Sequence, residues 1–216
     1  MIRAIIFDMD GVLIDSQPMH YEGDRLTLAA HGIDVPTEEM VAYAGTTNAL
    51  RFGIFKDQYN LTEQIETLIE EREKIMIDLV TSSHAKPTAG SVALLQSIKN
   101  AGLKTAVASS SSYPFIYAVL HKLGIETYFD LIFSGESVPN GKPAPDVFLE
   151  TCRRLDETPG NCVVIEDSSN GVLAAVRAVI TCVGYQNPTS GEQDLSKAAA
   201  VINDFRTIDA EFLINL

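Results

Sequence analysis

The chain has 216 residues, of which 16 are basic and 29 are acidic, so its formal net charge is −13. Because proteins that bind a nucleic-acid backbone or an anionic membrane need a basic face, this charge argues against both kinds of partner. The hydrophobic share of 46% and the charged share of 21% are typical of a globular protein. No apolar run approaches the roughly 20 residues of a membrane span or the pattern of a secretory signal, so we expect a cytoplasmic protein.

Five short stretches rich in apolar and β-branched residues predict buried strands. In chain order they lie at 2–7, 104–108, 131–133, 162–165 and 180–183. Helical stretches alternate with the later strands, at 91–101, 114–123 and 145–155. Near-continuous apolar strands are typical of a parallel sheet that is covered on both faces. The alternation therefore predicts an α/β fold, a Rossmann-like doubly wound parallel sheet.

The segment 16–86 interrupts this alternation and contains no convincing strand. Helical patterns lie at 19–31 and 61–80. Between them, Thr37 and the two acids that follow it resemble the start of a further helix, since acids are favoured in a first turn. The segment is therefore predicted to be all-helical.

The chain must pass twice between the strand-rich part and this helical part. Small, polar and proline residues at 14–18 and 82–87 are typical of linkers and mark the two crossings. We therefore predict an α/β core domain formed by 1–15 and 87–216, with a helical domain, 16–86, inserted into it.

Two acids follow the first predicted strand directly. Asp8 and Asp10 are two residues apart, so on an extended backbone their side chains point the same way. Such a pair is costly unless a cation neutralises it. Gly11 then permits an abrupt turn. The pattern indicates a cation site rather than two solvated loop acids.

Polar residues also follow later strands, where open α/β sheets bind ligands. Ser109 and Ser110, in a run of four serines, form either an anion-binding turn or an ordinary turn. Lys142 lies in a loop that two prolines stiffen, although most loop lysines are simply solvated. Glu166 and Asp167 suit Mg²⁺ or, as the alternative, cap the following helix.

In this order, the Asp-x-Asp pair, the serine, the lysine loop Gly141-Lys142-Pro143 and the acid pair resemble the haloacid dehalogenase-like hydrolase superfamily. The resemblance extends over essentially the whole chain. The helical insert is similar to the C1-type cap of the subgroup that contains β-phosphoglucomutase and many sugar-phosphate phosphatases. The fold implied by this family is the same α/β core with an inserted helical cap domain.

The resemblance implies a Mg²⁺-dependent phosphatase that hydrolyses a small phosphorylated metabolite, a sugar phosphate. Asp8 would attack phosphorus and form an aspartyl phosphate, while Asp10 would protonate the leaving oxygen and then deprotonate the incoming water. Mg²⁺ would be held by the Asp8 carboxylate, the Asp10 backbone carbonyl and Asp167, with Glu166 nearby. The side chains implied to hold the transferring phosphate are Ser109, Ser110 and Lys142.

The cap residues bear on whether the phosphate is released or moved within the substrate. His20 stands where the mutases carry a cap histidine, although a hinge or surface histidine is the alternative. Asn48 replaces a phosphate-binding arginine of the mutases, Arg51 is a candidate substitute one turn further, and Thr46 in the same cap loop is a further substrate candidate. Ser112 replaces a mutase lysine. These departures favour hydrolysis over a β-phosphoglucomutase-type phosphomutase, which stays the alternative.

A further departure lies at the end of the helix that follows the acid pair. Val179 stands where the family usually has glycine. Because a valine disfavours the left-handed backbone conformation in which such helices end, we expect a locally altered helix end there.

A response-regulator receiver is a further alternative, since it also arranges acids, a hydroxyl and a lysine around Mg²⁺ on a doubly wound sheet. Two features argue against it: the inserted helical domain, and the Asp-x-Asp-Gly sequence directly after the first strand. For the haloacid dehalogenase-like enzyme we expect a monomer or a weak homodimer.

Overall fold

The computed structural model describes residues 1–43 and 47–216. The chain forms two compact units, one made of Met1–Asp15 with Ala85–Leu216 and the other of Ser16–His84. The second boundary therefore lies two residues before the position predicted from the linker composition. No helix of the described residues is long and apolar enough to cross a membrane.

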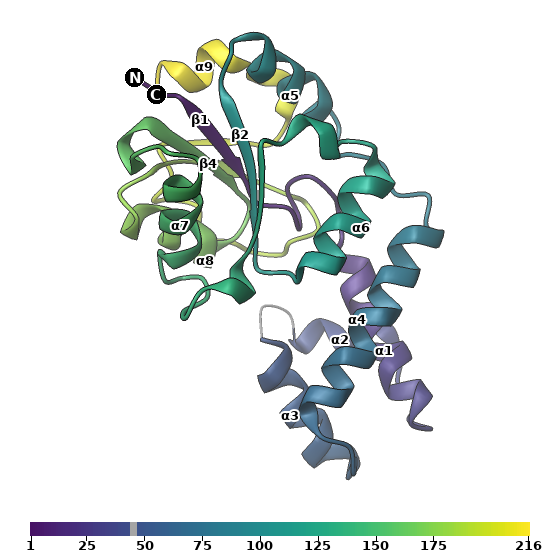
Figure 1. The fold of residues 1–216 in the computed structure, drawn as a ribbon. Helices are drawn as coiled ribbons and strands as arrows, with labels where there is room; N and C mark the ends of the chain where they lie inside the picture. Colours follow the sequence, from purple (N-terminus) through teal and green to yellow (C-terminus); the bar gives the residue numbers. More distant parts are fainter. Residues whose placement is uncertain (44–46) are drawn as a thin grey trace. The chain divides into compact units, whose positions relative to one another are not determined.

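The larger unit, called the core below, contains one sheet of six parallel strands in the order β3-β2-β1-β4-β5-β6 (Figure 1). The strands are β1 (Ala4–Phe7), β2 (Lys104–Ser109), β3 (Leu131–Ser134), β4 (Cys162–Glu166), β5 (Thr181–Tyr185) and β6 (Ala200–Ile202). This order is that of a doubly wound fold, so the predicted fold class is confirmed. β6 was not predicted, because it is a three-residue edge strand whose central Val201 is half exposed.

The register of the sheet brings the ends of three strands together. Phe7 at the end of β1 pairs with Val107 on β2 and with Ile165 on β4. Because the three strands are parallel and end at the same edge, the residues that follow them meet there. Asp8, directly after β1, continues the ladder by donating its backbone N–H to the Ile165 carbonyl at 2.9 Å.

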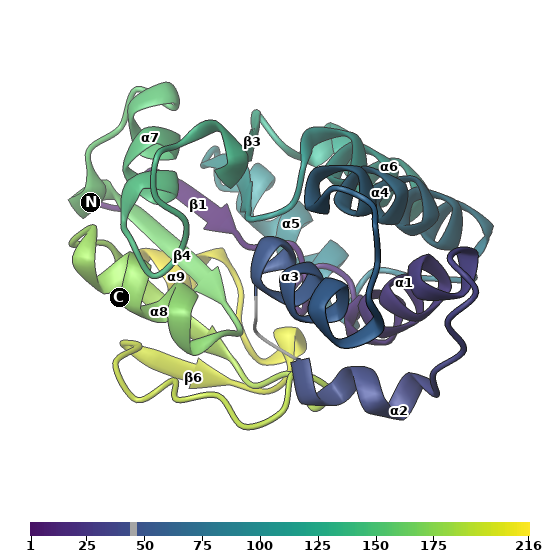
Figure 2. The same ribbon diagram turned by 90° about the horizontal axis from the view of Figure 1, so that it is seen from below.

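Helices cover both faces of the sheet, as the buried strands require. The core helices are α5 (Ser91–Asn100), α6 (Tyr113–Leu123), α7 (Asp146–Arg154), α8 (Ser169–Arg177) and α9 (Ala210–Ile214). Short 3₁₀ turns lie at Glu126–Tyr128, Gly135–Ser137, Pro159–Asn161 and Phe205–Thr207. α7 and α8 lie side by side on one face (Figures 1 and 2). There Phe148 of α7 and Val172 of α8 pack into one apolar cluster with Ile6 and Val164 of the sheet.

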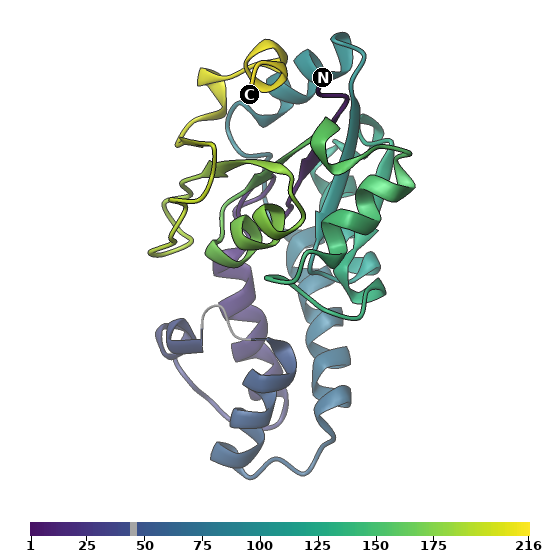
Figure 3. The same cartoon turned by 90° about the vertical axis from the view of Figure 1, so that its left-hand side faces the viewer.

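The smaller unit, called the cap below, contains helices and connecting loops but no strand among its described residues. Its helices are α1 (Gln17–Ala30), α2 (Thr37–Met40), a 3₁₀ turn (Val41–Tyr43), α3 (Asn48–Tyr59) and α4 (Ile65–Ser82). α1 and α4 lie side by side (Figure 3). Leu28 and Leu68 pack with Phe52 and Phe55 of α3 into a separate core. α3 was not predicted as a helix, although its buried Phe52 and Phe55 have helical spacing.

The C-terminus of α8 differs from the prediction. The helix ends with the hydrogen bonds of a regular Schellman motif, from the N–H of Val179 to the Val176 carbonyl and from the N–H of Ile180 to the Ala175 carbonyl, both at 3.0 Å. Val179 itself adopts the left-handed conformation, with φ of 58°. The expectation of an altered helix end is therefore wrong: the hydrogen bonds of the motif force the valine into a strained conformation instead.

Replacing Val179 with glycine is expected to stabilise the protein by about 1 kcal/mol, because glycine adopts this conformation without a Cβ clash. The side chain is 79% exposed, so the substitution removes little packing. Alanine at the same position keeps the Cβ and should recover only a small part of the gain. Urea unfolding of the three proteins measures the difference; a glycine variant no more stable than the wild type would contradict the strain argument.

Candidate active site

Lys142 joins the ends of β1, β2 and β4. Its Nζ atom lies 2.5 Å from Asp8 Oδ1 and 2.8 Å from Glu166 Oε1, and it donates to the Ala108 carbonyl at 3.3 Å. A lysine ammonium has three N–H donors, so all three have an acceptor here. Lys142 and the two acids are buried. The prediction left a solvated loop lysine open, and this geometry excludes it.

The loop after β1 turns sharply because of Gly11. Its backbone has φ of 81°, which L-residues with a side chain rarely adopt. Its N–H donates to the Ile14 carbonyl at 2.8 Å, and the Met9 carbonyl accepts from Leu13 at 2.9 Å. A Cβ at Gly11 would lie 1.9 Å from Asp167 Oδ2. The glycine is thus required both for the predicted turn and for the close approach of Asp167 to this loop.

Asp10 lies beside the serine loop that follows β2. Asp10 Oδ2 accepts from Ser111 Oγ at 2.8 Å and from Ser109 Oγ at 3.3 Å. The Ser111 N–H donates to Ser109 Oγ at 3.0 Å, so the two serines are held together. Ser110 lies between them with an exposed side chain, and Ser112 caps α6 by accepting from Phe115.

Ser111 is a contact that the sequence analysis did not single out. Four consecutive serines look alike, but residues two apart on an extended backbone point to the same side. Pairing Ser109 with Ser111 instead of Ser110 would have followed from that spacing.

The acid pair at the end of β4, Glu166 and Asp167, does not occupy the N-cap position of α8. Ser168 fills that position, since its Oγ accepts from the Gly171 N–H at 3.0 Å. Glu166 Oε2 accepts from the N–H and the Oγ of Ser168, at 2.7 and 2.9 Å. A Cβ at Gly171 would lie 1.6 Å from Glu166 Oε1, so a glycine is needed there. Asp167 Oδ2 accepts from Ser190 Oγ at 2.5 Å.

Burial and crowded negative charge dominate the electrostatics of the site. Burial raises the pKa of Asp8 well above its ordinary value; Lys142 opposes this shift, and the carboxylates of Glu166, Asp167 and Asp10 add to it. Burial also raises the pKa of Asp167, to about 7, with the Glu166 charge adding to the shift. Burial alone would lower the pKa of Lys142, but Asp8 and Glu166 hold that pKa above its ordinary value.

The raised pKa of Asp167 predicts how stability depends on pH in metal-free protein. The folded state keeps this proton up to a pH of about 7, whereas an unperturbed aspartate has a pKa near 3.8 and loses the proton there. The stabilisation is therefore full below pH 3.8 and is lost as the pH rises through about 7. Urea unfolding in EDTA across this window should show the wild type losing stability relative to Asp167→Asn. Parallel curves for the two proteins would contradict the shift.

The residues present fit a divalent cation with oxygen ligands. The charges of Asp10, Glu166 and Asp167 act on Asp8, and among the described residues Lys142 is the cation that opposes them, which leaves an excess of negative charge around a buried carboxyl. Because Gly11 has no side chain, the Asp167 carboxylate can lie close to the loop that carries Asp8 and Asp10. Within residues 1–43 and 47–216, no group of three or more His, Cys, Asp or Glu side chains is arranged as a metal site. The set implied by the family does not need one, because it consists of two carboxylates and a backbone carbonyl.

The cap places two of the sequence-predicted candidates in one buried network. Arg51 Nε lies 2.8 Å from Asp24 Oδ2, and Arg51 Nη2 donates to Asn48 Oδ1 at 2.6 Å. Burial lowers the pKa of Arg51, and Asp24 opposes that shift. The partner of Arg51 inside the cap is thus Asp24, an acid that the sequence analysis did not single out.

The third cap candidate joins the same network through a second arginine. Arg72 Nε lies 2.5 Å from Asp24 Oδ1, and Arg72 Nη2 lies 3.0 Å from His20 Nδ1. His20 is therefore half-buried and contacts Arg72, which differs from the surface histidine that the prediction left open. Thr46, the fourth candidate, lies outside the described residues.

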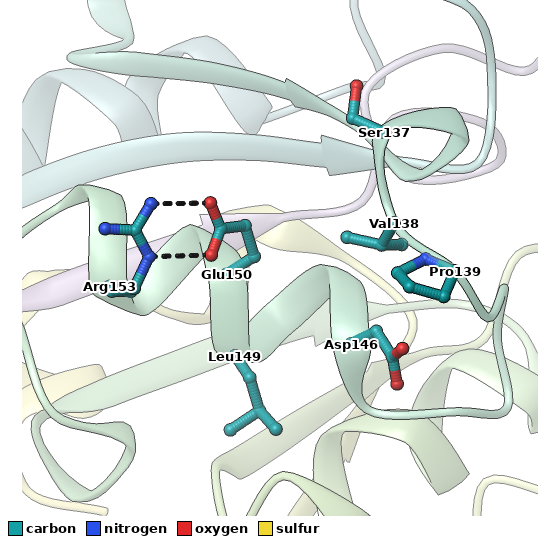
Figure 4. Close-up of a pocket in the computed structure, with 7 residues that line it drawn as sticks. All are labelled: Ser137, Val138, Pro139, Asp146, Leu149, Glu150 and Arg153. Atoms are coloured by element: carbon teal, nitrogen blue, oxygen red, sulfur yellow. Dashed lines mark hydrogen bonds and ion pairs between the residues drawn. The ribbon is translucent and has the colours of Figure 1, made fainter.

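A surface pocket of about 360 Å³ lies beside α7, apart from these residues (Figure 4). Val138 and Leu149 line it, with Glu150 paired to Arg153. It contains none of the sequence-predicted site residues. The acids and Lys142 at the strand ends are the better candidate for chemistry.

The sequence model of the haloacid dehalogenase-like hydrolase family matches residues 2–178. This range includes all the sequence-predicted site residues of the core, from Asp8 to Asp167. The chain belongs to this family. It is similar to a phosphorylated carbohydrates phosphatase of Thermotoga maritima, with 30% identity over 205 residues and 93% of each chain covered. The predicted family is therefore confirmed, and the predicted enzyme class, a phosphatase, agrees with that relative's name.

Solved structures of the family have the same fold. CbbY from Rhodobacter sphaeroides, in complex with phosphate, is 26% identical, with a TM-score of 0.85 and 95% of each chain covered. The β-phosphoglucomutase from Clostridium difficile is 28% identical, with a TM-score of 0.81, and the match covers 100% of this chain and 96% of that one. The similarity thus includes both a hydrolase name and a mutase name.

Proposed function

We propose that this member of the haloacid dehalogenase-like family is a Mg²⁺-dependent phosphatase that hydrolyses a sugar phosphate through an aspartyl phosphate, an acyl phosphate formed on Asp8. The observation that carries the proposal is the set of buried contacts around Asp8. One carboxylate oxygen is held by Lys142, and a second acid, Asp10, lies two residues on with two serine hydroxyls on it. A nucleophile, an acid and anion-binding donors are thereby gathered at one sheet edge.

Asp8 is suited to be the nucleophile. Burial disfavours its charge, so its carboxylate is poorly solvated and more reactive than a loop acid in water. Its attack on phosphorus breaks the bond to the leaving oxygen and forms an aspartyl phosphate. Lys142, a point charge at 2.5 Å from Asp8, balances the negative charge of the transferring group, and Ser109 supplies a further donor.

Asp10 is suited to move the proton. In the first step it protonates the leaving oxygen, and in the second it takes a proton from the water that attacks the aspartyl phosphate. The hydroxyl of Ser111 at 2.8 Å orients its carboxylate. The same residue thus acts as acid and then as base, which the two half-reactions require.

The groups that would hold Mg²⁺ are the Asp8 carboxylate, the Asp10 backbone carbonyl and Asp167, with Glu166 nearby. When bound, Mg²⁺ offsets the repulsion between the carboxylates and an anionic phosphate. Glu166 is already engaged by Lys142 and Ser168, which fits a supporting place beside the ion.

Two observations support a sugar phosphate and its hydrolysis. The Thermotoga maritima relative is named for phosphorylated carbohydrates. In the cap, Asn48 replaces the arginine expected in a mutase, and its side-chain oxygen accepts a hydrogen bond from Arg51. A bisphosphate intermediate needs a cation for its second phosphate, so the replacement of that arginine by Asn48 favours release of phosphate to water.

The test is phosphate release from a panel of sugar phosphates, nucleotides, phosphoglycolate and pyrophosphate, with Mg²⁺ and with EDTA. Conversion of β-glucose 1-phosphate to glucose 6-phosphate is measured alongside. Mg²⁺-dependent release from sugar phosphates is the expected result. Isomerisation without release would establish the mutase alternative, and no release from any compound by the Mg²⁺-loaded protein would overturn the proposal.

A further inference from the structure

The chain between β5 and β6 approaches two separate parts of the candidate site. Ser190 Oγ donates to Asp167 Oδ2 at 2.5 Å, and Asn187 Nδ2 donates to the Gly11 carbonyl at 3.0 Å. Asp167 follows β4, whereas Gly11 belongs to the loop after β1. One segment, 187–190, therefore holds both the loop that carries Asp8 and Asp10 and the acid that is meant to share a metal with them.

The side-chain amide of Asn187 is fixed in one orientation. Its Oδ1 accepts from the N–H of Thr189 and lies within hydrogen-bond distance of that residue's Oγ1, both at 3.0 Å. Its Nδ2 must therefore face the carbonyl of Gly11. The residue is buried, so an unpaired amide there would be costly, and the contact with Gly11 is firmly specified. Thr189 adds a third link, with Oγ1 at 2.7 Å from Asp15 Oδ1.

The same connection is also attached on its other side. Gln193 Nε2 donates to the Ser190 carbonyl at 2.8 Å, and Gln193 Oε1 accepts from the N–H of Ser169 at 2.9 Å. Ser169 begins α8, two residues after Asp167. Ser190 is thus held from both directions, and its hydroxyl keeps its place relative to Asp167.

We propose that Ser190 and Asn187 are positioning residues that hold Asp167 against the loop after β1 and thereby set the affinity of this site for Mg²⁺. The inference rests on the proposed function, because it takes Asp167 as a metal ligand. The Ser190 hydroxyl directs one oxygen of Asp167, which leaves the other for the ion. Without that hydroxyl the buried carboxylate rotates or takes up a proton, and it must be reorganised before an ion binds.

The experiment is calorimetric titration of the metal-stripped, full-length protein with Mg²⁺. Ser190→Ala is expected to weaken Mg²⁺ binding about tenfold, the lower end of the range for groups that orient metal ligands. Ser190→Thr keeps the hydroxyl and should restore binding to within about twofold of the wild type. Ser196→Ala removes an exposed hydroxyl from the same connection and should leave binding unchanged. Thermal unfolding without metal checks that each variant is folded.

Activity supplies a second readout. At saturating Mg²⁺, Ser190→Ala should recover most of the wild-type kcat, while the Mg²⁺ concentration for half-maximal rate rises about tenfold. A merely structural defect would lower kcat at every Mg²⁺ concentration. Asn187→Ala tests the other end of the segment and should weaken Mg²⁺ binding in the same direction.

The outcomes separate this inference from the proposed function. If the wild type binds Mg²⁺ and Asp167→Asn weakens it but Ser190→Ala does not, this inference alone is overturned. The inference is also overturned if Ser190→Thr binds Mg²⁺ as weakly as Ser190→Ala, because the hydroxyl then does not determine the affinity. If Ser190→Ala weakens Mg²⁺ binding in a protein that releases no phosphate from any substrate, the inference stands and the phosphatase proposal fails.

Discussion

Replacing Lys142 with methionine is expected to lower kcat roughly 1,000-fold and to destabilise the protein by about 3 kcal/mol at pH 8. Methionine has a similar length but no charge. In the wild type, Lys142 Nζ lies 2.5 Å from Asp8 and 2.8 Å from Glu166. The substitution leaves these two buried acids without their shared partner. Removing one side of a buried ion pair is costly because the remaining charge is not solvated. Denaturant unfolding and steady-state kinetics measure the two effects.

The loss of stability should shrink at lower pH, because Asp8, whose pKa burial raises, can then take up a proton and cease to be a buried charge. Adding Glu166→Gln to the Lys142→Met protein should restore part of the stability but not the activity. Lys99→Met is the matched control, since Lys99 pairs with Asp130 at the surface and both side chains are about a third or more exposed. That change should alter stability by roughly 1 kcal/mol or less. Equal losses in the two lysine variants would contradict the special place of Lys142.

The sheet and the strand-end residues could be predicted because each depends on a short stretch of chain. An apolar run such as Cys162–Glu166 indicates a buried strand by itself, and parallel strands end at one edge. Asp8, Ser109 and Glu166 therefore had to lie near one another once the strands were recognised. The position of Lys142 could not be predicted in this way. Lys142 lies in the loop between β3 and α7, and no local sequence pattern sets the length of that loop. Its place in the site was implied by the family resemblance.

The partners of these residues could not be predicted. Ser190 and Asn187 lie in a polar connection with the composition of an ordinary loop, and their contacts with Asp167 and Gly11 span 23 and 176 residues of chain. The same holds in the cap, where Asp24 and Arg72 are 48 residues apart. A turn-forming asparagine or serine indicates that a loop exists. Which buried acid it meets depends on how the loop crosses the edge of the folded sheet.

Val179 shows a different limit. The left-handed conformation is unfavourable for valine, but the local cost is only of the order of 1–2 kcal/mol. The competing hydrogen bonds of the helix end, together with burial of Ile180 directly after it, favour the regular motif. Tertiary packing therefore decides the conformation against the residue's own preference. The sequence therefore identifies the strained position correctly. It does not predict that the helix end keeps its hydrogen bonds while Val179 adopts the unfavourable conformation.

Asp8→Asn is expected to lower kcat roughly 10,000-fold, equal to about 5.5 kcal/mol of transition-state stabilisation, while leaving the fold intact. The amide keeps the shape of the carboxylate but cannot attack phosphorus. Because burial and three neighbouring acids already raise the pKa of Asp8 against the pull of Lys142, loss of its charge should not destabilise the metal-free protein at pH 8 and should raise its Tm. Activity and stability are thus expected to change in opposite directions.

The matched control for this prediction is Asp156→Asn, the same chemical change at an exposed acid. Asp156 has φ of 56°, a conformation that asparagine tolerates, so neither kcat nor Tm should fall. Intact mass of the Asp8→Asn protein before and after the assay excludes deamidation back to aspartate as a source of residual rate. Turnover above about 1% of wild type in protein of the correct mass would mean that Asp8 is not the nucleophile. A lowered Tm would mean instead that its pair with Lys142 outweighs the cost of burying its charge, which the raised pKa of Asp8 argues against.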